Sequence, residues 1–166
     1  MGKVIGFIDN IEKVMIASGI FLTSVIIFVN VILRYFFDSG IVWAEESVRY
    51  IIIYIVMLGS SLAVTKNDHI AVSIFENSSV EWFAHLIYGL QTILSLVFVL
   101  VTTYFGIVVV NSVQETAQIS PAMQIPMWSV YMIFPISTAL MSVKLIYNVI
   151  IWIKTKQIPS KEGDIQ

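Results

Sequence analysis

Four long stretches without Asp, Glu, Lys or Arg divide this 166-residue chain. They cover residues 14–33, 50–65, 82–114 and 116–143. A helix needs about 20 apolar residues to cross the hydrocarbon core of a membrane. The stretches are continuously apolar rather than alternating, and a helix satisfies its own backbone hydrogen bonds in lipid. The sequence therefore predicts an all-α integral membrane protein with four tilted transmembrane helices, near residues 14–33, 47–65, 82–110 and 127–150.

The composition also indicates a membrane protein. Hydrophobic residues make up 58% of the chain and charged residues only 12%, whereas about 25% of residues are charged in a typical soluble domain. The formal net charge of −2 gives no electrostatic reason to bind nucleic acid. The chain has no cysteine, which excludes disulfides, thiolate metal sites and iron–sulfur clusters.

The basic residues predict how the chain crosses the membrane. Residues 1–158 are expected to form one four-helix membrane domain, followed by a short tail at 159–166. Only Arg34 and Arg49 lie on the side of the loops after the first and third spans. The opposite side carries Lys3, Lys13, Lys66, Lys154, Lys156 and Lys161. Because basic residues concentrate on the cytoplasmic side, both termini and the tail are expected in the cytoplasm.

Ionisable groups are scarce at membrane depth, where they normally mark transport pathways. The predicted cores of the first three spans contain no Asp, Glu, Lys or Arg. Lys144 lies near the cytoplasmic end of the fourth span, and two interpretations stay open for it. Its ammonium group reaches the lipid headgroups, or it pairs with an acid or a lipid phosphate at a subunit interface. No catalytic residue is predicted.

Metal or haem binding would need His residues that converge. His69 and His85 both fall at the predicted cytoplasmic end, and no ligand spacing links them to a third residue. No cofactor or metal site is therefore predicted. Two alternative functions stay open. In one the chain is a haem-bearing or structural membrane anchor of a respiratory complex, and in the other it is an autonomous small transporter.

Small residues in the predicted spans indicate close helix packing. Gly59 and Ala63 are four residues apart, a spacing that lets another helix approach the backbone. Residues 17–19 of the first span offer a similar surface. Pro135 is expected to kink the fourth span because it lacks an amide N–H. These features describe helices that dock onto a partner rather than a conduit.

The segment between the first two spans carries unusual polar content. Glu45 precedes Arg49 by four residues, a favourable orientation for a helical ion pair. A short amphipathic interfacial helix is therefore expected here, with Trp43 at the membrane boundary. Two arginines on the non-cytoplasmic side suggest partners for them, and we expect Arg34 and Arg49 to pair with Glu45, Glu46 or lipid phosphate.

The segment between the last two spans is nearly uncharged and contains two prolines. Pro121 and Pro126 stop helix formation and stiffen the loop around Ser120. Such a loop fits either a protein contact or a simple re-entry turn. The residues expected at partner or lipid interfaces are thus Arg34, Trp43, Glu45, Glu46, Arg49, Gly59, Ala63, Ser120, Pro121, Pro126 and Lys144.

A series of short motifs covers most of the chain, from Asn30 to about Pro135. They are Asn30-Val31-Ile32-Leu33-Arg34-Tyr35, Trp43-Ala44-Glu45-Glu46, Arg49-Tyr50, Gly59, His69-Ile70, Ser120-Pro121-Ala122 and Pro126-Met127-Trp128. In order and spacing the chain resembles the small, DctQ-type permease subunit of tripartite ATP-independent periplasmic (TRAP) transporters. One departure lies at Val72-Ser73, where the family often has an acidic residue.

The resemblance implies a non-catalytic subunit of a sodium-driven, binding-protein-dependent transporter of organic acids, nearest to sialic acid systems. The implied partners are a large membrane subunit (M), which carries the substrate and sodium sites and moves as an elevator, and a periplasmic substrate-binding protein (P). The small subunit would enlarge and anchor the fixed scaffold. The resemblance also implies a multi-pass protein of the bacterial inner membrane, in contact with lipids and without a cofactor.

The orientation can be tested by thiol labelling, because the chain has no cysteine of its own. Cysteine placed at Ser39 or Gln118 is expected to react with an impermeant reagent in cells whose outer membrane has been opened. Cysteine at Asn67 is expected to react only after the inner membrane is also opened. Labelling of Asn67→Cys from outside the inner membrane would contradict the orientation.

Overall fold

The protein is described here by a computed structural model that covers residues 2–65 and 81–155. Its helices are α1 (Gly2–Phe37), α2 (Ala44–Thr65), α4 (Glu81–Glu115), α5 (Met127–Tyr131) and α6 (Ile133–Thr155). Four segments are long and apolar enough to span a membrane: Ile5–Phe37, Ala44–Val64, Leu86–Glu115 and Met127–Lys154. The predicted all-α fold with four spans is confirmed.

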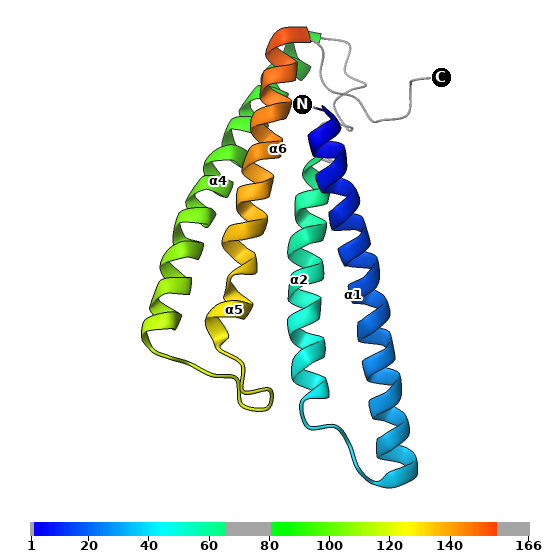
Figure 1. Ribbon diagram of the computed structural model, residues 1–166. Coiled ribbons are helices and arrows are strands. Elements are labelled where there is room, and N and C mark those ends of the chain that lie inside the picture. The colour runs from blue at the N-terminus through cyan, green and yellow to red at the C-terminus, as the bar shows by residue number, and fades with distance from the viewer. Residues whose placement is uncertain (1, 66–80, 156–166) are drawn as a thin grey trace, which may run out of the picture.

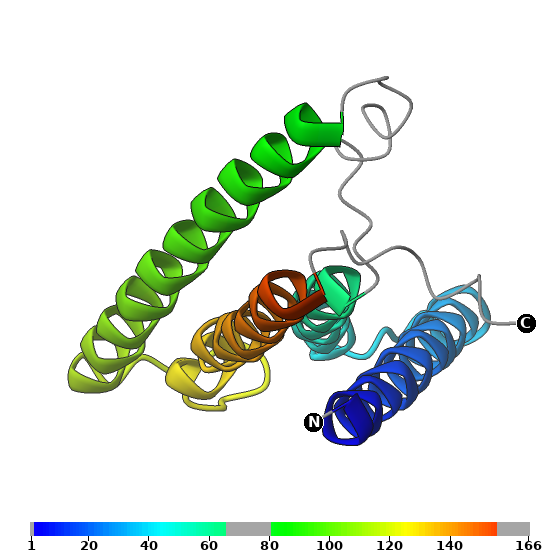
Figure 2. The ribbon, with the colours of Figure 1, turned by 90° about the horizontal axis from the view of Figure 1, so that it is seen from above.

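The helices lie in a row rather than in a closed bundle. α1 packs on α2, α2 on α6, and α6 on α4, and Figure 2 shows this order from above. Residues 38–43 and the 116–126 loop connect the helices at one end of their long axes, which we call the loop end of the molecule (Figure 1). α1 begins and α6 ends at the opposite end, which we call the terminal end.

The helices extend further than the predicted spans. α1 begins at Gly2 and α4 continues to Glu115, because a hydropathy rule finds the lipid-facing part of a helix and not its polar ends. The short amphipathic helix expected before the second span is not a separate element. Residues 44–65 form one unbroken helix, since no Gly or Pro interrupts its first turns.

Pro135 interrupts the last span, as the sequence predicts. The break falls at Met132, between α5 and α6, about one turn before the proline. A proline cannot donate the hydrogen bond that would reach back four residues. Around the break, Met132 N–H still donates to the Trp128 carbonyl at 3.0 Å, and Ile136 N–H donates to the Met132 carbonyl at 3.3 Å.

Glycines provide two of the close helix contacts. A Cβ atom at Gly19 would lie 3.0 Å from the Ile55 side chain, so the missing side chain lets α1 approach α2. A Cβ at Gly106 would lie 3.3 Å from the backbone nitrogen of Pro135, where α4 meets α6. Gly59 differs, because nothing lies within 4 Å of a Cβ built there. The small-residue strip predicted on α2 is therefore not used for packing among the described residues.

Candidate functional site

Glu46 fixes the loop end of the molecule. Its Oε2 accepts hydrogen bonds from the backbone N–H groups of Ala122 at 2.8 Å and Met123 at 2.9 Å. Its Oε1 accepts the hydroxyl of Tyr50 at 2.5 Å. One turn further along α2, the Tyr54 hydroxyl donates to the Ser129 carbonyl at 2.7 Å. These contacts bind the 116–126 loop and α5 to the first turns of α2.

The anchored loop is a tight hairpin. Ser120 N–H donates to the Ile125 carbonyl, and Met127 N–H donates to the Gln118 carbonyl, both at 2.9 Å. Gln124 takes a left-handed conformation with φ of 54° at the turn. Pro121 and Pro126 flank the turn, and Pro126 is extended just before α5. The loop is therefore held in a defined shape while Ile119 remains 65% exposed.

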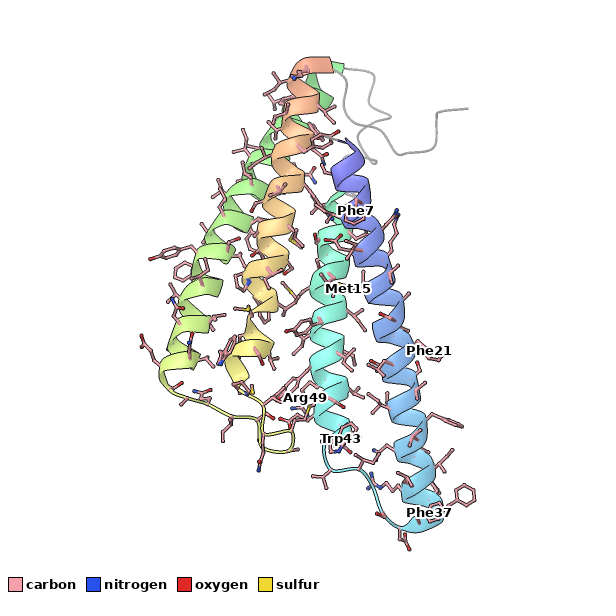
Figure 3. The ribbon with its side chains drawn as sticks, viewed as in Figure 1. Phe7, Met15, Phe21, Phe37, Trp43 and Arg49 are labelled. Carbon is pink, nitrogen blue, oxygen red and sulfur yellow. The ribbon has the colours of Figure 1, made fainter. Side chains whose placement is uncertain are left out.

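The ion pairs predicted between the two arginines and Glu45 or Glu46 are wrong. Arg34, Glu45 and Arg49 are exposed, and none of them forms an ion pair with another described residue. Glu46 instead binds loop amides and a hydroxyl, which together satisfy its carboxylate. Figure 3 shows Trp43 and Arg49 near the start of α2, where Trp43 is 46% exposed. The two arginines thus remain open to external groups.

Lys144 lies at the centre of a buried polar cluster toward the terminal end. Only 2% of the residue is exposed. Its Nζ contacts Asp9 Oδ1 at 2.9 Å and Glu12 Oε2 at 2.5 Å, and donates to the Ser61 carbonyl at 3.2 Å. The Ser61 hydroxyl donates to Glu12 Oε1 at 2.7 Å. We call these four residues the Lys144 cluster; it joins α1, α2 and α6.

The sequence interpretation that pairs Lys144 with an acid is confirmed, but the acids belong to the same chain and not to a partner subunit. The interpretation that the ammonium group reaches the lipid headgroups is wrong, because the group is buried among these partners. Asp9 and Glu12 were missed because the predicted first span began at residue 14. Two acids three residues apart lie on one face of a helix. That spacing beside a single intramembrane lysine is the signal that would have found the cluster.

The remaining candidate surface is apolar. Gly59 has open space beside it and Ala63 is exposed. Figure 3 shows labelled side chains of α1, of which Phe7 is 66% and Phe21 72% exposed. A groove of about 580 Å³ runs between α1 and α2 and includes Gly19 in its lining. Lipid or a partner helix must cover these faces in a membrane.

Metal-binding residues do not cluster in the part of the chain that the structure describes. No group of three or more His, Cys, Asp or Glu residues gathers within the described part of the chain. His69 and the side chain of His85, on which the haem alternative depends, lie outside the residues that the structure describes.

Four apolar helices with their buried charges bonded to one another define a multi-pass membrane protein. Residues 23–155 match the family described as tripartite ATP-independent periplasmic transporters, DctQ component. The chain therefore belongs to the DctQ family, the small permease component of TRAP transporters. The resemblance noted in the sequence motifs is confirmed.

Curated relatives agree with this family. The chain is 39% identical over 71 residues to a TRAP transporter small permease protein of Haemophilus influenzae. The aligned region covers 43% of this chain and 44% of the relative. It is 35% identical over 71 residues to the C4-dicarboxylate TRAP transporter small permease protein DctQ of Vibrio cholerae, covering 43% and 31%. It is 26% identical over 152 residues to the isethionate TRAP transporter permease protein DctMQ of Oleidesulfovibrio alaskensis, covering 87% and 24%. Each match spans less than half of the relative's length.

The role of Glu46 can be tested by hydrogen exchange. Glu46→Gln places an amide, with its own donors, against two N–H groups and a hydroxyl. Hydrogen bonds to a charged group contribute about 1.5–3 kcal/mol, so exchange at Ala122 and Met123 is expected to quicken about tenfold or more. Glu45→Gln is the matched control, because Glu45 is exposed and has no such contacts. Equal exchange in both variants would show that Glu46 does not hold the loop.

Proposed function

We propose that this chain enlarges and anchors the fixed scaffold of a large, elevator-type permease subunit in a sodium-driven transporter of organic acids. The observation that carries the proposal is the relative named permease protein DctMQ, which matches 87% of this chain with only 24% of its own length. A DctQ-like unit and a much longer remainder thus share one polypeptide there. We propose that the present chain associates with a large subunit in the same way.

The described charges support a scaffold role. Lys144, Asp9 and Glu12 are the buried charged residues of the described part, and they contact one another. Groups already bonded in this way are poorly placed to coordinate sodium or a substrate carboxylate. The substrate site is therefore assigned to the large subunit. Two relatives are named for C4-dicarboxylate and isethionate, both organic anions, and sialic acid is the substrate we favour from the sequence motifs.

The loop end is proposed to face the periplasm of a bacterial inner membrane, with both termini in the cytoplasm. The six-to-two lysine and arginine asymmetry of the sequence supports this orientation. The hairpin held by Glu46 presents Pro121 and Pro126 at that end in a fixed shape, whereas Ser120, expected at the same surface, is buried. Exposed Arg34 and Arg49 lie toward the same end of the molecule. This end is proposed to help receive the binding protein.

The large subunit is proposed to dock on the open faces of α1 and α2. Association between helices in lipid rests on van der Waals packing, which small residues promote. Gly59→Leu and Ala63→Leu fill the open strip on α2, so each is expected to reduce co-purification of the large subunit severalfold. The fold should remain intact, because nothing described lies within 4 Å of a Cβ built at Gly59 and Ala63 is exposed.

A matched control is available on another helix. Ala139 is also a small, exposed residue but lies on α6, so Ala139→Leu is expected to retain the large subunit. Full retention of the partner by both α2 variants would place the docking face elsewhere.

Reconstitution tests the proposed function itself. Liposomes that contain this chain alone are expected to take up no organic acid. Liposomes that contain it with the large subunit are expected to do so when the binding protein and a sodium gradient are supplied. Uptake by this chain alone would contradict the proposal, and a haem absorbance band in the purified protein would favour the respiratory anchor.

A further inference from the structure

The Lys144 cluster links helices that are distant in the sequence. Lys144 and Glu12 are 132 positions apart. In the row of helices, α1 packs extensively only on α2, and α6 lies on the other side of α2. The Lys144 side chain hydrogen-bonds with the Ser61 carbonyl of α2 and also contacts the two acids of α1.

The acids of α1 depend on that lysine. Asp9 and Glu12 are 7% and 2% exposed, and a buried charge is strongly unfavourable without a countercharge and hydrogen bonds. Ser61 contributes one hydroxyl to Glu12. Lys144 forms an ion pair with each acid, and it is the only ion-pair partner of Glu12 among the described residues. The exposed Lys13 on the same helix is not paired with them.

Little apolar side-chain surface is buried on this half of α1. Ile5 is the buried hydrophobic residue that the described part of α1 contains. A Cβ built at Gly6 has nothing within 4 Å, whereas one built at Gly19, further toward the loop end, would lie 3.0 Å from the Ile55 side chain. If the lysine were absent, the two acids would lower their energy by moving toward water. The helix can do this by tilting away from α2 beyond Gly19.

We propose that Lys144 is a charge lock, which fixes the terminal half of α1 on α2 and makes the position of the first span depend on the last. α1 then reaches its final place only when α6 is also in the membrane. A second contact, from Asn148 Nδ2 to the Val64 carbonyl at 3.4 Å, joins α6 to α2 one turn further along. The lock therefore connects α1 to a pair of helices that are already joined.

Thiol labelling of the purified full chain in lipid nanodiscs tests the lock. Ile5 is 9% exposed and lies one turn before Asp9, so the single thiol of Ile5→Cys should react slowly with a small maleimide. Adding Lys144→Met is expected to increase its labelling rate at least tenfold. Lys154→Met is the matched control, because Lys154 is an exposed lysine of the same helix, and it should leave the rate unchanged.

Two further variants make the result decisive. Asn10→Cys lies on the exposed side of α1, so its labelling rate should be the same with Lys144, Lys144→Met or Lys154→Met. An unchanged rate at this position distinguishes a local movement of α1 from unfolding of the whole protein. Exchanging the charges with Glu12→Lys and Lys144→Glu keeps an ion pair between α1 and α6. This double variant should return the Ile5→Cys rate to within about threefold of the original. The lock is refuted if Lys144→Met leaves Ile5→Cys protected, or if the charge exchange labels as fast as Lys144→Met.

Discussion

Burying an ammonium group among apolar helices is unfavourable unless its donors and its charge are satisfied, and this requirement organises the terminal end of the protein. Lys144 meets it with two carboxylates and a backbone carbonyl from two other helices. Removing one member of a buried ion pair typically costs about 3–5 kcal/mol. The contact is therefore weak evidence for high stability but strong evidence for one particular arrangement of α1, α2 and α6.

α2 is the element to which both ends of the molecule are attached. At the terminal end, Ser61 hydrogen-bonds with Glu12 and Lys144. At the loop end, Glu46 and Tyr54 bind the hairpin loop and α5. These polar contacts run from the first turn of α2 to its middle at Tyr54 and return near its other end at Ser61. This arrangement fixes the row of helices while leaving the faces of α1 and α4 apolar, as a subunit that packs in lipid requires.

The sequence predicted what depends on local patterns. Charge-free runs identified all four spans, and Pro135 identified the break in the last one. The sequence did not predict which acid meets which base. The spacing of Glu45 and Arg49 suggested a local pair, whereas Glu46 binds amides 76 and 77 residues away. Lys144 likewise finds its acids on the first helix, because packing across the row decides such contacts.

The placement of the charges bears on what the subunit can do. A transport site needs polar groups that are open to the substrate and can change partners. Here the buried carboxylates already contact Lys144, and Glu46 is occupied by the loop. The exposed guanidinium groups of Arg34 and Arg49 lie at the loop end together with the exposed carboxylates of Asp38, Glu45 and Glu115. The buried charges thus fix the arrangement of the helices and of the 116–126 loop. The exposed charges are available to a partner that approaches the loop end.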